Sequence, residues 1–463
     1  MFFQSIKKGE EKMFKKKILL LICVAFLLVL SWSLLAHGEN LYKGETIHVV
    51  TFKLSGMDEI INRIPEFEEK YDINVKLDEI SMEAMRSKMR IDFSAGTKQI
   101  DVALSSVHIT PTLIASNDIE PIDRFLESDL VEPELLAWDD FTPAAIDNIT
   151  SPVKISSKEE KVWGLPHDLL VQGLIYRKSL YEKYNLSVPK TLSELLHNAK
   201  IINENESVKG MYGISLRSLR SPQIIWSWGQ IFRAMGGKYF EDFPNDLHPT
   251  MDTEVTVEAL KFFKECFKYS PPGSENQAYT EVVSQLSSGQ AAQTLDDIMF
   301  SLWLEDPKKS VAPEDWGYAL IPLKEGLTYD DIKYGPSVSM SNHWVINADI
   351  SEARKQAAFK FIQWATSKPL LKDLSEKGYM TGVLTRKSMY ELNKDKAWAI
   401  AHMQNQKHSS KYFRPKLPEW VQLEDELALR VSSVLIGDLS AEEAAKQLQD
   451  VFTQIVKDAG YID

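Results

Sequence analysis

Residues 45–106 alternate strand-like and helix-like segments, and this alternation constrains the fold more than any other feature. The strand-like segments are 45–52, 73–80 and 100–106, and the helix-like segments are 57–71 and 82–96. Strands separated by helices form right-handed crossovers, which place successive strands parallel in one sheet. The sequence therefore predicts an α/β fold with a mostly parallel sheet.

The chain length predicts more than one folding unit. A chain of 463 residues is longer than one hydrophobic core normally serves, and domains of roughly 150 to 250 residues are expected. Its hydrophobic fraction of 44% and charged fraction of 26% are typical of folded globular proteins. We expect two α/β lobes.

The first 38 residues predict export. Three lysines at 15–17 precede an uncharged apolar run at 18–36, and Ala36-His37-Gly38 has the small-x-small pattern of a signal cleavage site. The run is also long enough to remain as a membrane anchor. Lipidation at Cys23 is the less favoured alternative, because Ile22 stands where a small residue is usual.

The charge distribution argues against polyanionic partners. Residues 1–38 carry six Lys and two Glu, a net +4, so the other 425 residues carry −17 against −13 for the whole chain. An acidic body of this kind repels nucleic acid and anionic lipid. The remaining cysteine, Cys266, lies at helical spacing with Leu260 and Phe263 and is expected to be a core residue.

Common catalytic and metal-binding motifs are missing from the sequence. There is no HExxH, CxxC, EF-hand loop, phosphate-binding glycine loop or GxSxG elbow. We therefore expect no metal and no cofactor. The acid pairs at 139–140, 159–160 and 330–331 lie in polar loops, where a solvated surface is the expected state rather than the carboxylate pair of a glycosidase.

Another acid pair ends a small and uncharged stretch. In SSGQAAQTLDD, residues 287–297, Asp296 and Asp297 follow a small and uncharged run. Ligand-binding groups of open α/β sheets stand beyond the carboxyl ends of strands. A turn cap is the alternative, and these residues alone leave both interpretations open.

Aromatic and polar residues occur together at several predicted loop ends. They are Trp226 and Trp228 in IIWSWGQIF, His343 and Trp344 in SNHWVI, His167 and Asp168 in LPHDLL, and Trp420 in PKLPEWV. Flat rings suit the apolar faces of a sugar, and carboxylates, imidazoles and amides suit its hydroxyls. Trp303 and Trp364 are assigned to helix packing instead, because a tryptophan more often fills a core than contacts a ligand.

Several segments resemble family 1 extracellular solute-binding proteins of bacterial ABC importers. The resemblance is carried by GLPHDLLVQGLIYRKSLYEKYNLSVPKTLSELLHNAK (164–200) and KFIQWATS (360–367). MYGISLR (211–217), the segment 268–292, SLWLEDPKKS (301–310) and LTRKSMY (384–390) are similar to the sorbitol and mannitol binders within that family. The likeness extends from Thr46 to Tyr461.

This resemblance implies the fold and the site residues. The expected fold is α/β and periplasmic-binding-protein-like (type II), with two lobes around a hinge and a ligand cleft. Asp296 would accept hydrogen bonds from ligand hydroxyls, while Asp297 would only cap the loop. The other implied ligand-binding residues are Arg217, Trp344, His167 and Asp168, followed by Trp226, His108 and Trp420. Gln293 and Thr294 replace an aromatic-bearing pair, so the resemblance leaves a different sugar or an oligosaccharide open as the ligand.

The resemblance also implies lobe boundaries and partners. The first lobe would comprise residues 39–167 and 323–372, and the second 168–322 and 373–463. The chain would cross between them near 165–170, 320–325 and 370–375. The expected partners are a small carbohydrate and the membrane permease of an ABC importer, with a monomeric receptor. A secreted carbohydrate-active enzyme and a ligand sensor for a membrane kinase are the alternatives.

Three further elements are expected from local signals. Thr191 and Glu194 form a capping box at the start of a helix. Residues 211–216, MYGISL, are expected to form a strand. The stretch 439–460 has one apolar face and predicts a C-terminal amphipathic helix.

Overall fold

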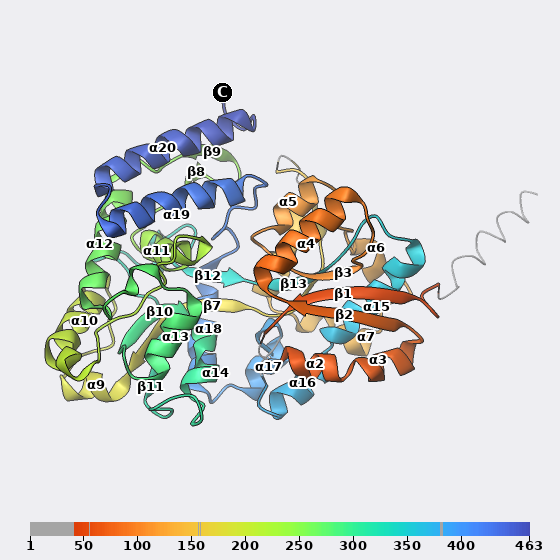
Figure 1. Cartoon of the computed structure of the whole chain (residues 1–463), viewed down its shortest axis with the longest axis horizontal. Helices are drawn as coiled ribbons and strands as arrows, with labels where there is room; N and C mark the ends of the chain where they lie inside the picture. The colour runs from red at the N-terminus through yellow and green to blue at the C-terminus, as the bar shows by residue number, and fades with distance from the viewer. Residues whose placement is uncertain (1–40, 55, 156, 158, 380–382) are drawn as a thin grey trace, which may run out of the picture.

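The computed structural model describes residues 41–463 except 55, 156, 158 and 380–382. These residues form two α/β lobes side by side, joined by segments that run between them (Figure 1). None of the helices in this part of the chain is long and apolar enough to cross a membrane. The predicted signal or anchor at 1–38 lies outside the described residues.

The first lobe is built on a five-stranded sheet in the order β2-β1-β3-β13-β6. Its strands are β1 (Thr46–Phe52), β2 (Asn74–Ile80), β3 (Val102–Ser106), β6 (Leu165–Pro166) and β13 (Asn342–Ile346). β1 pairs in parallel with β2 and β3, as the alternation of strands and helices predicts, whereas β13 runs antiparallel to β3 and β6. A short hairpin, β4 (Thr150–Pro152) and β5 (Glu160–Val162), lies outside this sheet.

Helices surround the sheet of the first lobe. They are α2 (Met57–Asn62), α3 (Ile64–Tyr71), α4 (Met82–Ala95), α5 (Thr110–Ala115), α6 (Asp123–Leu126), α7 (Pro133–Leu136), α8 (Pro143–Ile149), α15 (Glu352–Ala365) and α16 (Lys368–Glu376), with 3-10 turns η1 (Trp138–Asp140) and η7 (Val383–Thr385). α4 and α15 both pack against β1, whose buried side chains form one core with Phe67, Phe361 and Trp364. The packing role predicted for Trp364 is confirmed.

The second lobe contains a sheet of β10-β7-β12-β14, with β11 also paired to β7. These strands are β7 (Leu170–Arg177), β10 (Gln293–Asp297), β11 (Trp316–Ala319), β12 (Ser337–Met340) and β14 (Ser409–Ser410). β7 runs antiparallel to β10, β11 and β12. Only β12 and β14 pair in parallel in this sheet, so the mostly parallel arrangement predicted from residues 45–106 does not extend to the second lobe.

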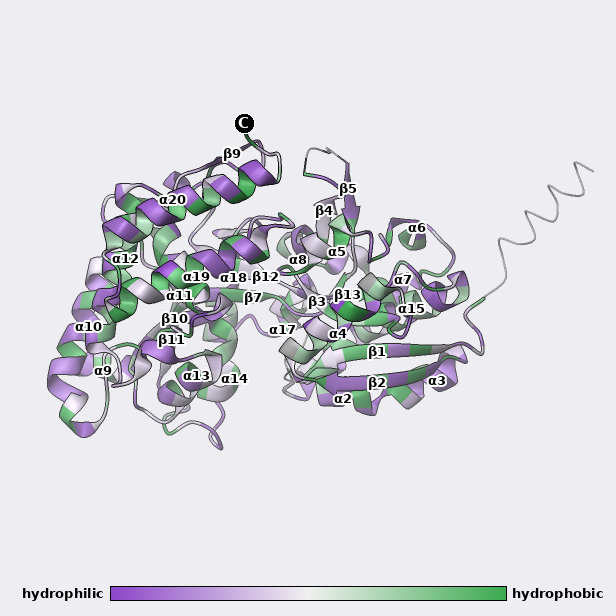
Figure 2. Ribbon diagram, turned by 45° about the horizontal axis from the view of Figure 1, so that its top comes forward, coloured by the Kyte–Doolittle hydropathy of each residue, from purple (hydrophilic) through white to green (hydrophobic). Residues whose placement is uncertain are grey.

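The helices of the second lobe cover this sheet and form a helical layer beyond it. They are α9 (Lys178–Lys183), α10 (Leu192–Glu206), α11 (Pro222–Ala234), α12 (Glu254–Cys266), α13 (Tyr279–Ser287), α14 (Ser301–Leu304), α18 (Ala397–Lys407), α19 (Trp420–Ile436) and α20 (Ala441–Asp458), with 3-10 turns η2 (Ser207–Lys209), η3 (Phe267–Tyr269), η4 (Ser274–Asn276), η5 (Ile298–Phe300) and η6 (Tyr329–Asp331). Figure 2 shows green and purple stripes along α20, the amphipathic pattern predicted for the C-terminus. Its apolar side packs against α12 and α19.

Local signals in the second lobe are mostly confirmed. Thr191 and Glu194 form the expected capping box at the start of α10. Cys266 is a buried free thiol at the end of α12, and Trp303 packs against a small core cluster. The strand predicted at 211–216 is wrong, because only Tyr212 forms an isolated bridge, to Ala291.

The chain crosses between the lobes at three places, two of which differ from the prediction. The first crossing lies between β6 and β7, within the predicted 165–170. The second lies at Ser341, not at 320–325, because β12 still pairs with β7 and β13 is the first strand to return to the first sheet. The third lies beyond Arg386, not at 370–375. α16 still packs on α7 of the first lobe, and Arg386 forms an isolated backbone β-bridge with Phe141 of the same lobe. α17 (Lys387–Leu392) follows it.

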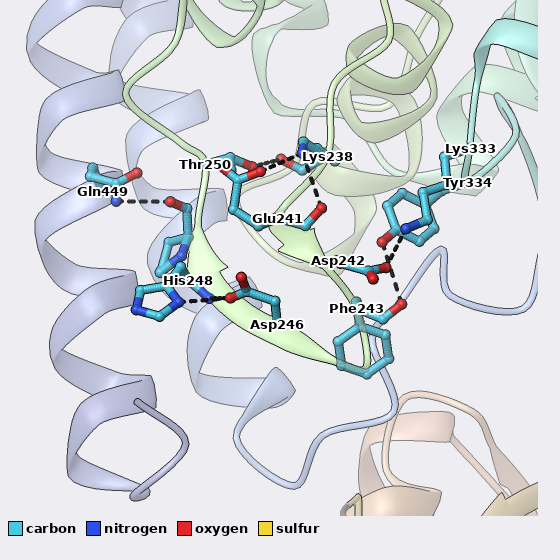
Figure 3. A network of polar contacts seen from close by, with 11 residues as sticks. Lys238, Glu241, Asp242, Phe243, Asp246, His248, Thr250, Lys333, Tyr334 and Gln449 are labelled. Atoms are coloured by element: carbon cyan, nitrogen blue, oxygen red, sulfur yellow. Dashed lines mark hydrogen bonds and ion pairs between the residues drawn. The ribbon is translucent and has the colours of Figure 1, made fainter. Parts of the chain in front are cut away.

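A hairpin, β8 (Phe240–Asp242) and β9 (Asp246–Pro249), is fixed to the outside of the second lobe. Figure 3 shows Gln449 of α20 donating to the Pro249 carbonyl, at 2.9 Å, on one side of the hairpin. On the other side Tyr334 donates to the Phe243 carbonyl and Lys333 pairs with Asp242. The hairpin is therefore attached to both neighbouring elements.

Candidate ligand-binding site

The two acids that end β10 lie where the chain crosses between the lobes. Because β10 runs antiparallel to β7, Asp297 pairs with Gln172 and Asp296 with Gly173, close to the start of β7. A side chain at Gly173 would meet Ile298, Asn405 and the Ala319 carbonyl within 2.9 Å. The close approach of these elements therefore requires glycine there.

Asp296 is fully buried and paired with Arg217 through two hydrogen bonds. Nε of Arg217 donates to Oδ2 at 2.9 Å, and Nη2 donates to Oδ1 at 2.5 Å. Oδ1 also accepts from Nε1 of Trp226 at 2.9 Å and from the backbone N–H of Asp297 at 2.7 Å. This is a charge-assisted bidentate pair with two further donors on the same carboxylate.

Aromatic rings surround the Arg217 guanidinium. Its carbon lies 4.9 Å from the ring centre of Trp226, 5.0 Å from that of Tyr279 and 5.9 Å from that of Phe300. Nη1 donates to Gln223 at 3.0 Å. The site thus holds a cation in a cage of rings, which is a stabilising arrangement in a desolvated setting.

Asp297 acts as the cap of the turn that follows β10. Its Oδ1 accepts from the Met299 backbone N–H at 3.0 Å, so the capping role expected for it is confirmed. Burial, with the nearby Asp296 and Asp168 charges adding to it, raises the pKa of the Asp297 carboxyl to about 8. The protonated form is therefore the favoured one near neutral pH.

Asp168 lies on the first crossing and contacts the second. Its two carboxylate oxygens accept from the backbone N–H and the Nδ2 of Asn342, each at 2.7 Å. Burial raises the pKa of the Asp168 carboxyl to about 6, although both hydrogen bonds oppose the shift. Asp168 and Asp297 are close enough for their charges to interact, so the hinge and the end of β10 form one polar region.

His167 and Trp344 pair with each other inside the first lobe. Nε1 of Trp344 donates to Nδ1 of His167 at 3.2 Å, and the rings meet edge to face. Both side chains are buried, and Trp344 also packs against Phe361. Burial lowers the pKa of His167 to about 3, so its ring is neutral. The cleft-facing position expected for Trp344 is corrected to a core position, since all five residues of β13 are buried.

Trp420 and His108 are not among the hydrogen-bond partners of Asp296. Trp420 is a core residue of the second lobe, 5.1 Å from the Tyr239 ring, which corrects its expected cleft position. His108 follows β3 in the first lobe, and its Nδ1 lies 2.8 Å from Oε2 of Glu424 in the second. That contact has the distance of an ion pair but not the geometry of a hydrogen bond.

The structure thus brings together only part of the predicted set. Asp296, Arg217 and Trp226 form one cluster, and Asp168 belongs to the adjoining hinge. Gln223 and Tyr279 were not predicted. Tyr279 lies in a segment that resembles the polyol binders, and Gln223 lies in the first turn of α11, but both side chains reach Arg217 only through the tertiary fold. No group of three or more His, Cys, Asp or Glu side chains in the described part of the chain is arranged to hold a metal ion.

Comparisons with known proteins agree with this architecture. The sequence model of the bacterial extracellular solute-binding protein family matches residues 53–370. A mannitol-binding protein of Pseudomonas aeruginosa is 23% identical over 461 residues, covering 93% of this chain and 97% of the relative. A maltotriose-binding protein of Pyrococcus abyssi is 27% identical over 267 residues, covering 57% of this chain and 50% of the relative.

Two solved structures have the same fold. The solute-binding protein of Agrobacterium radiobacter K84 in complex with ribitol has a TM-score of 0.77 and 22% identity, covering 89% of this chain and 99% of that one. The solute-binding protein of Agrobacterium vitis S4 with bound D-mannitol has a TM-score of 0.73 and 23% identity, covering 90% of this chain and 100% of that one.

Proposed function

Because the chain belongs to the bacterial extracellular solute-binding protein family, we propose that it captures a polyol or sugar between its lobes and delivers it to an ABC importer permease. The observation that carries this proposal is the buried Asp296–Arg217 pair beside the crossing segments. Relatives that bind mannitol and ribitol support the ligand class. The delivery step, a monomeric state and a membrane tether at the N-terminus belong to the same proposal.

The hydrogen bonds already made at the site limit what a ligand can contact. Oδ1 of Asp296 accepts from three donors, whereas Oδ2 accepts from one, Nε of Arg217. Arg217 has five N–H groups, of which three donate to Asp296 and Gln223. A ligand hydroxyl would therefore donate to Oδ2 of Asp296 and accept from the remaining N–H groups of Arg217. One acceptor beside two donors suits neighbouring hydroxyls of a polyol.

Closure of the lobes around the bound ligand would produce the form that delivers it to the permease. A ligand that touches both lobes favours the closed form by its difference in affinity for the two forms. The Asp168–Asn342 contact fixes two crossing segments to each other, so bending would occur around a defined point. No bond of the ligand is broken in this mechanism, in contrast to the alternative of a secreted carbohydrate-active enzyme.

A thermal-shift screen of the full chain tests the function. Hexitols, pentitols, monosaccharides and maltose would be added one at a time, and the samples would be analysed for reaction products. A ligand at 100 times its dissociation constant stabilises the fold by about 2.7 kcal/mol, a shift of a few degrees. Stabilisation without product supports the receptor, whereas turnover of the carbohydrate would replace it with an enzyme.

A further inference from the structure

Residues 411–424 of the second lobe, here called the strap, reach across to the first lobe. The strap runs from the end of β14 into the first residues of α19, and both elements belong to the second lobe, since β14 pairs with β12 and α19 packs on α11 and α20. The strap nevertheless contacts His108, α5, α8 and the β4–β5 hairpin of the first lobe. The strap also touches the second crossing, because Nη1 of Arg414 donates to Sδ of Met340, next to Ser341, at 3.0 Å.

A buried ionic cluster forms the centre of the strap. Glu424 is fully buried, with Oε1 2.7 Å from Nε of Arg414 and Oε2 2.8 Å from Nδ1 of His108. Arg414 and His108 are also buried. Arg414 belongs to the strap, so the Arg414–Glu424 bond is internal to the second lobe, while the His108–Glu424 contact joins the lobes. Separation of the lobes would leave His108 without this partner.

Four more contacts join the strap to the first lobe. Lys416 donates to the Asp147 carbonyl at 2.6 Å and to the Thr150 carbonyl. Thr112 donates to the Pro418 carbonyl at 3.2 Å. Lys411 lies 3.7 Å from Glu160. All of them connect the strap to first-lobe groups that are distant in sequence, so they exist only while the lobes are together.

The strap is also connected to the ligand-binding cluster and to the outer hairpin. Phe413 lies 5.9 Å from the Trp226 ring, and Trp226 donates to Asp296. Tyr412 meets Phe243 of the β8–β9 hairpin edge to face, at 5.0 Å. Because α20 and the segment before β12 hold this hairpin in place (Figure 3), the strap has a rigid support behind it.

We propose that the strap is an inter-lobe latch, in which Glu424 and Lys416 are positioning residues that hold the lobes closed without contacting the ligand. The proposal rests on closure around a solute. Loss of the latch shifts the population of the ligand-free protein toward the open form, and a bound ligand then dissociates faster. The contacts of the latch stabilise the closed form in addition to the contacts that the ligand makes.

Hydrogen–deuterium exchange of the ligand-free full chain, in mild detergent, tests the latch. The comparison uses wild type, Glu424→Gln and Lys416→Met. In both variants, amides at 108–117 and 143–150 in the first lobe should exchange about tenfold faster, because each substitution removes a buried polar contact between the lobes. Exchange in β1 should not change. Lys416→Met retains the Arg414–Glu424 pair, so this variant alone still tests the latch if Glu424→Gln does not fold.

Asp315→Asn is the matched control. It breaks the Arg177–Asp315 pair, 2.6 Å long and largely buried but internal to the second lobe, and should leave residues 108–117 unaffected. Faster exchange of the strap alone, with the first lobe unchanged in Glu424→Gln and Lys416→Met, would overturn the latch and make the strap an internal brace of the second lobe. Since no ligand is present, this result is independent of the carbohydrate screen.

Discussion

Asp168 accepts two hydrogen bonds from Asn342, one from the backbone N–H and one from Nδ2, and both are 2.7 Å long. Asp168 lies on the first crossing between the lobes and Asn342 begins β13, directly after the second. The hinge is therefore braced by a carboxylate whose pKa burial has raised to about 6.

Asn342→Ala should destabilise the protein more at pH 8 than at pH 5. At pH 8 the Asp168 carboxyl, with a pKa of about 6, is ionised in the folded protein and needs the lost Nδ2 donor. We expect a loss of about 1.5 to 3 kcal/mol there, typical of a hydrogen bond to a charged group, and a smaller one at pH 5. Urea unfolding at both pH values measures it.

Asn347→Ala is the control for this pH dependence. Asn347 Nδ2 donates to the Ile100 carbonyl, an acceptor that does not titrate, at 2.8 Å in the same lobe. The loss in free energy of unfolding caused by Asn347→Ala should therefore be the same at both pH values. Equal losses at both pH values for Asn342→Ala would contradict the hinge brace.

Asp296 and Arg217 should show strong coupling in a double-mutant cycle. Asp296→Leu leaves the buried Arg217 charge without its carboxylate, at a cost of about 3 to 5 kcal/mol in the free energy of unfolding. Arg217→Met combined with Asp296→Leu removes both charges and should cost less than Asp296→Leu alone. Additive losses in urea unfolding would show that the pair does not act as a unit.

The stability of the ligand-free protein should fall as pH rises toward 8, and Asp297→Asn should remove that fall. The pKa of Asp297, about 8 when folded, lies above its value of about 3.9 in an unfolded chain. The folded protein thus holds this proton more tightly, a contribution fully present below pH 4 and lost as pH rises through 8. Urea unfolding from pH 4 to 9 measures how the free energy of unfolding changes with pH in wild type and in Asp297→Asn.

Asp252→Asn, at an exposed position, is the control and should show the same pH dependence as wild type. The same pH dependence in wild type and Asp297→Asn would contradict the raised pKa of Asp297.

Cys266 should not react with thiol reagents until the protein unfolds. It is buried in the second core, and burial raises the pKa of its thiol. In a Cys23→Ser background, modification by a maleimide should follow the urea unfolding curve. Rapid modification in buffer would mean that α12 opens locally in the native state.

The parallel part of the first sheet could be predicted because its information is local. The alternation in residues 45–106 sets β1, β2 and β3 and their parallel pairing. The crossings could not be placed in the same way. β12 and β13 are separated by Ser341 alone and are both largely buried, and only their pairing with β7 or β3 assigns them to a lobe.

The site was only partly predictable for a related reason. Asp296 ends a buried strand, and that position is visible in the sequence. Trp344 lies in a strand buried on both faces, so alternation does not reveal whether its ring faces a core or a cleft. The sequence likewise suggests Asp296 as a ligand contact, whereas its pairing with Arg217 gives it a structural role as well.

Isothermal titration of D-mannitol, D-sorbitol, ribitol and maltose into the full chain and into Asp296→Asn tests the central claim most directly. We predict that at least one of these ligands binds wild type with a stoichiometry near one. Asp296→Asn should weaken that binding by about tenfold or more, since the neutral amide replaces a charged acceptor at Oδ2. Absence of binding by all four, or equal affinity in the variant, would contradict a carbohydrate receptor centred on Asp296.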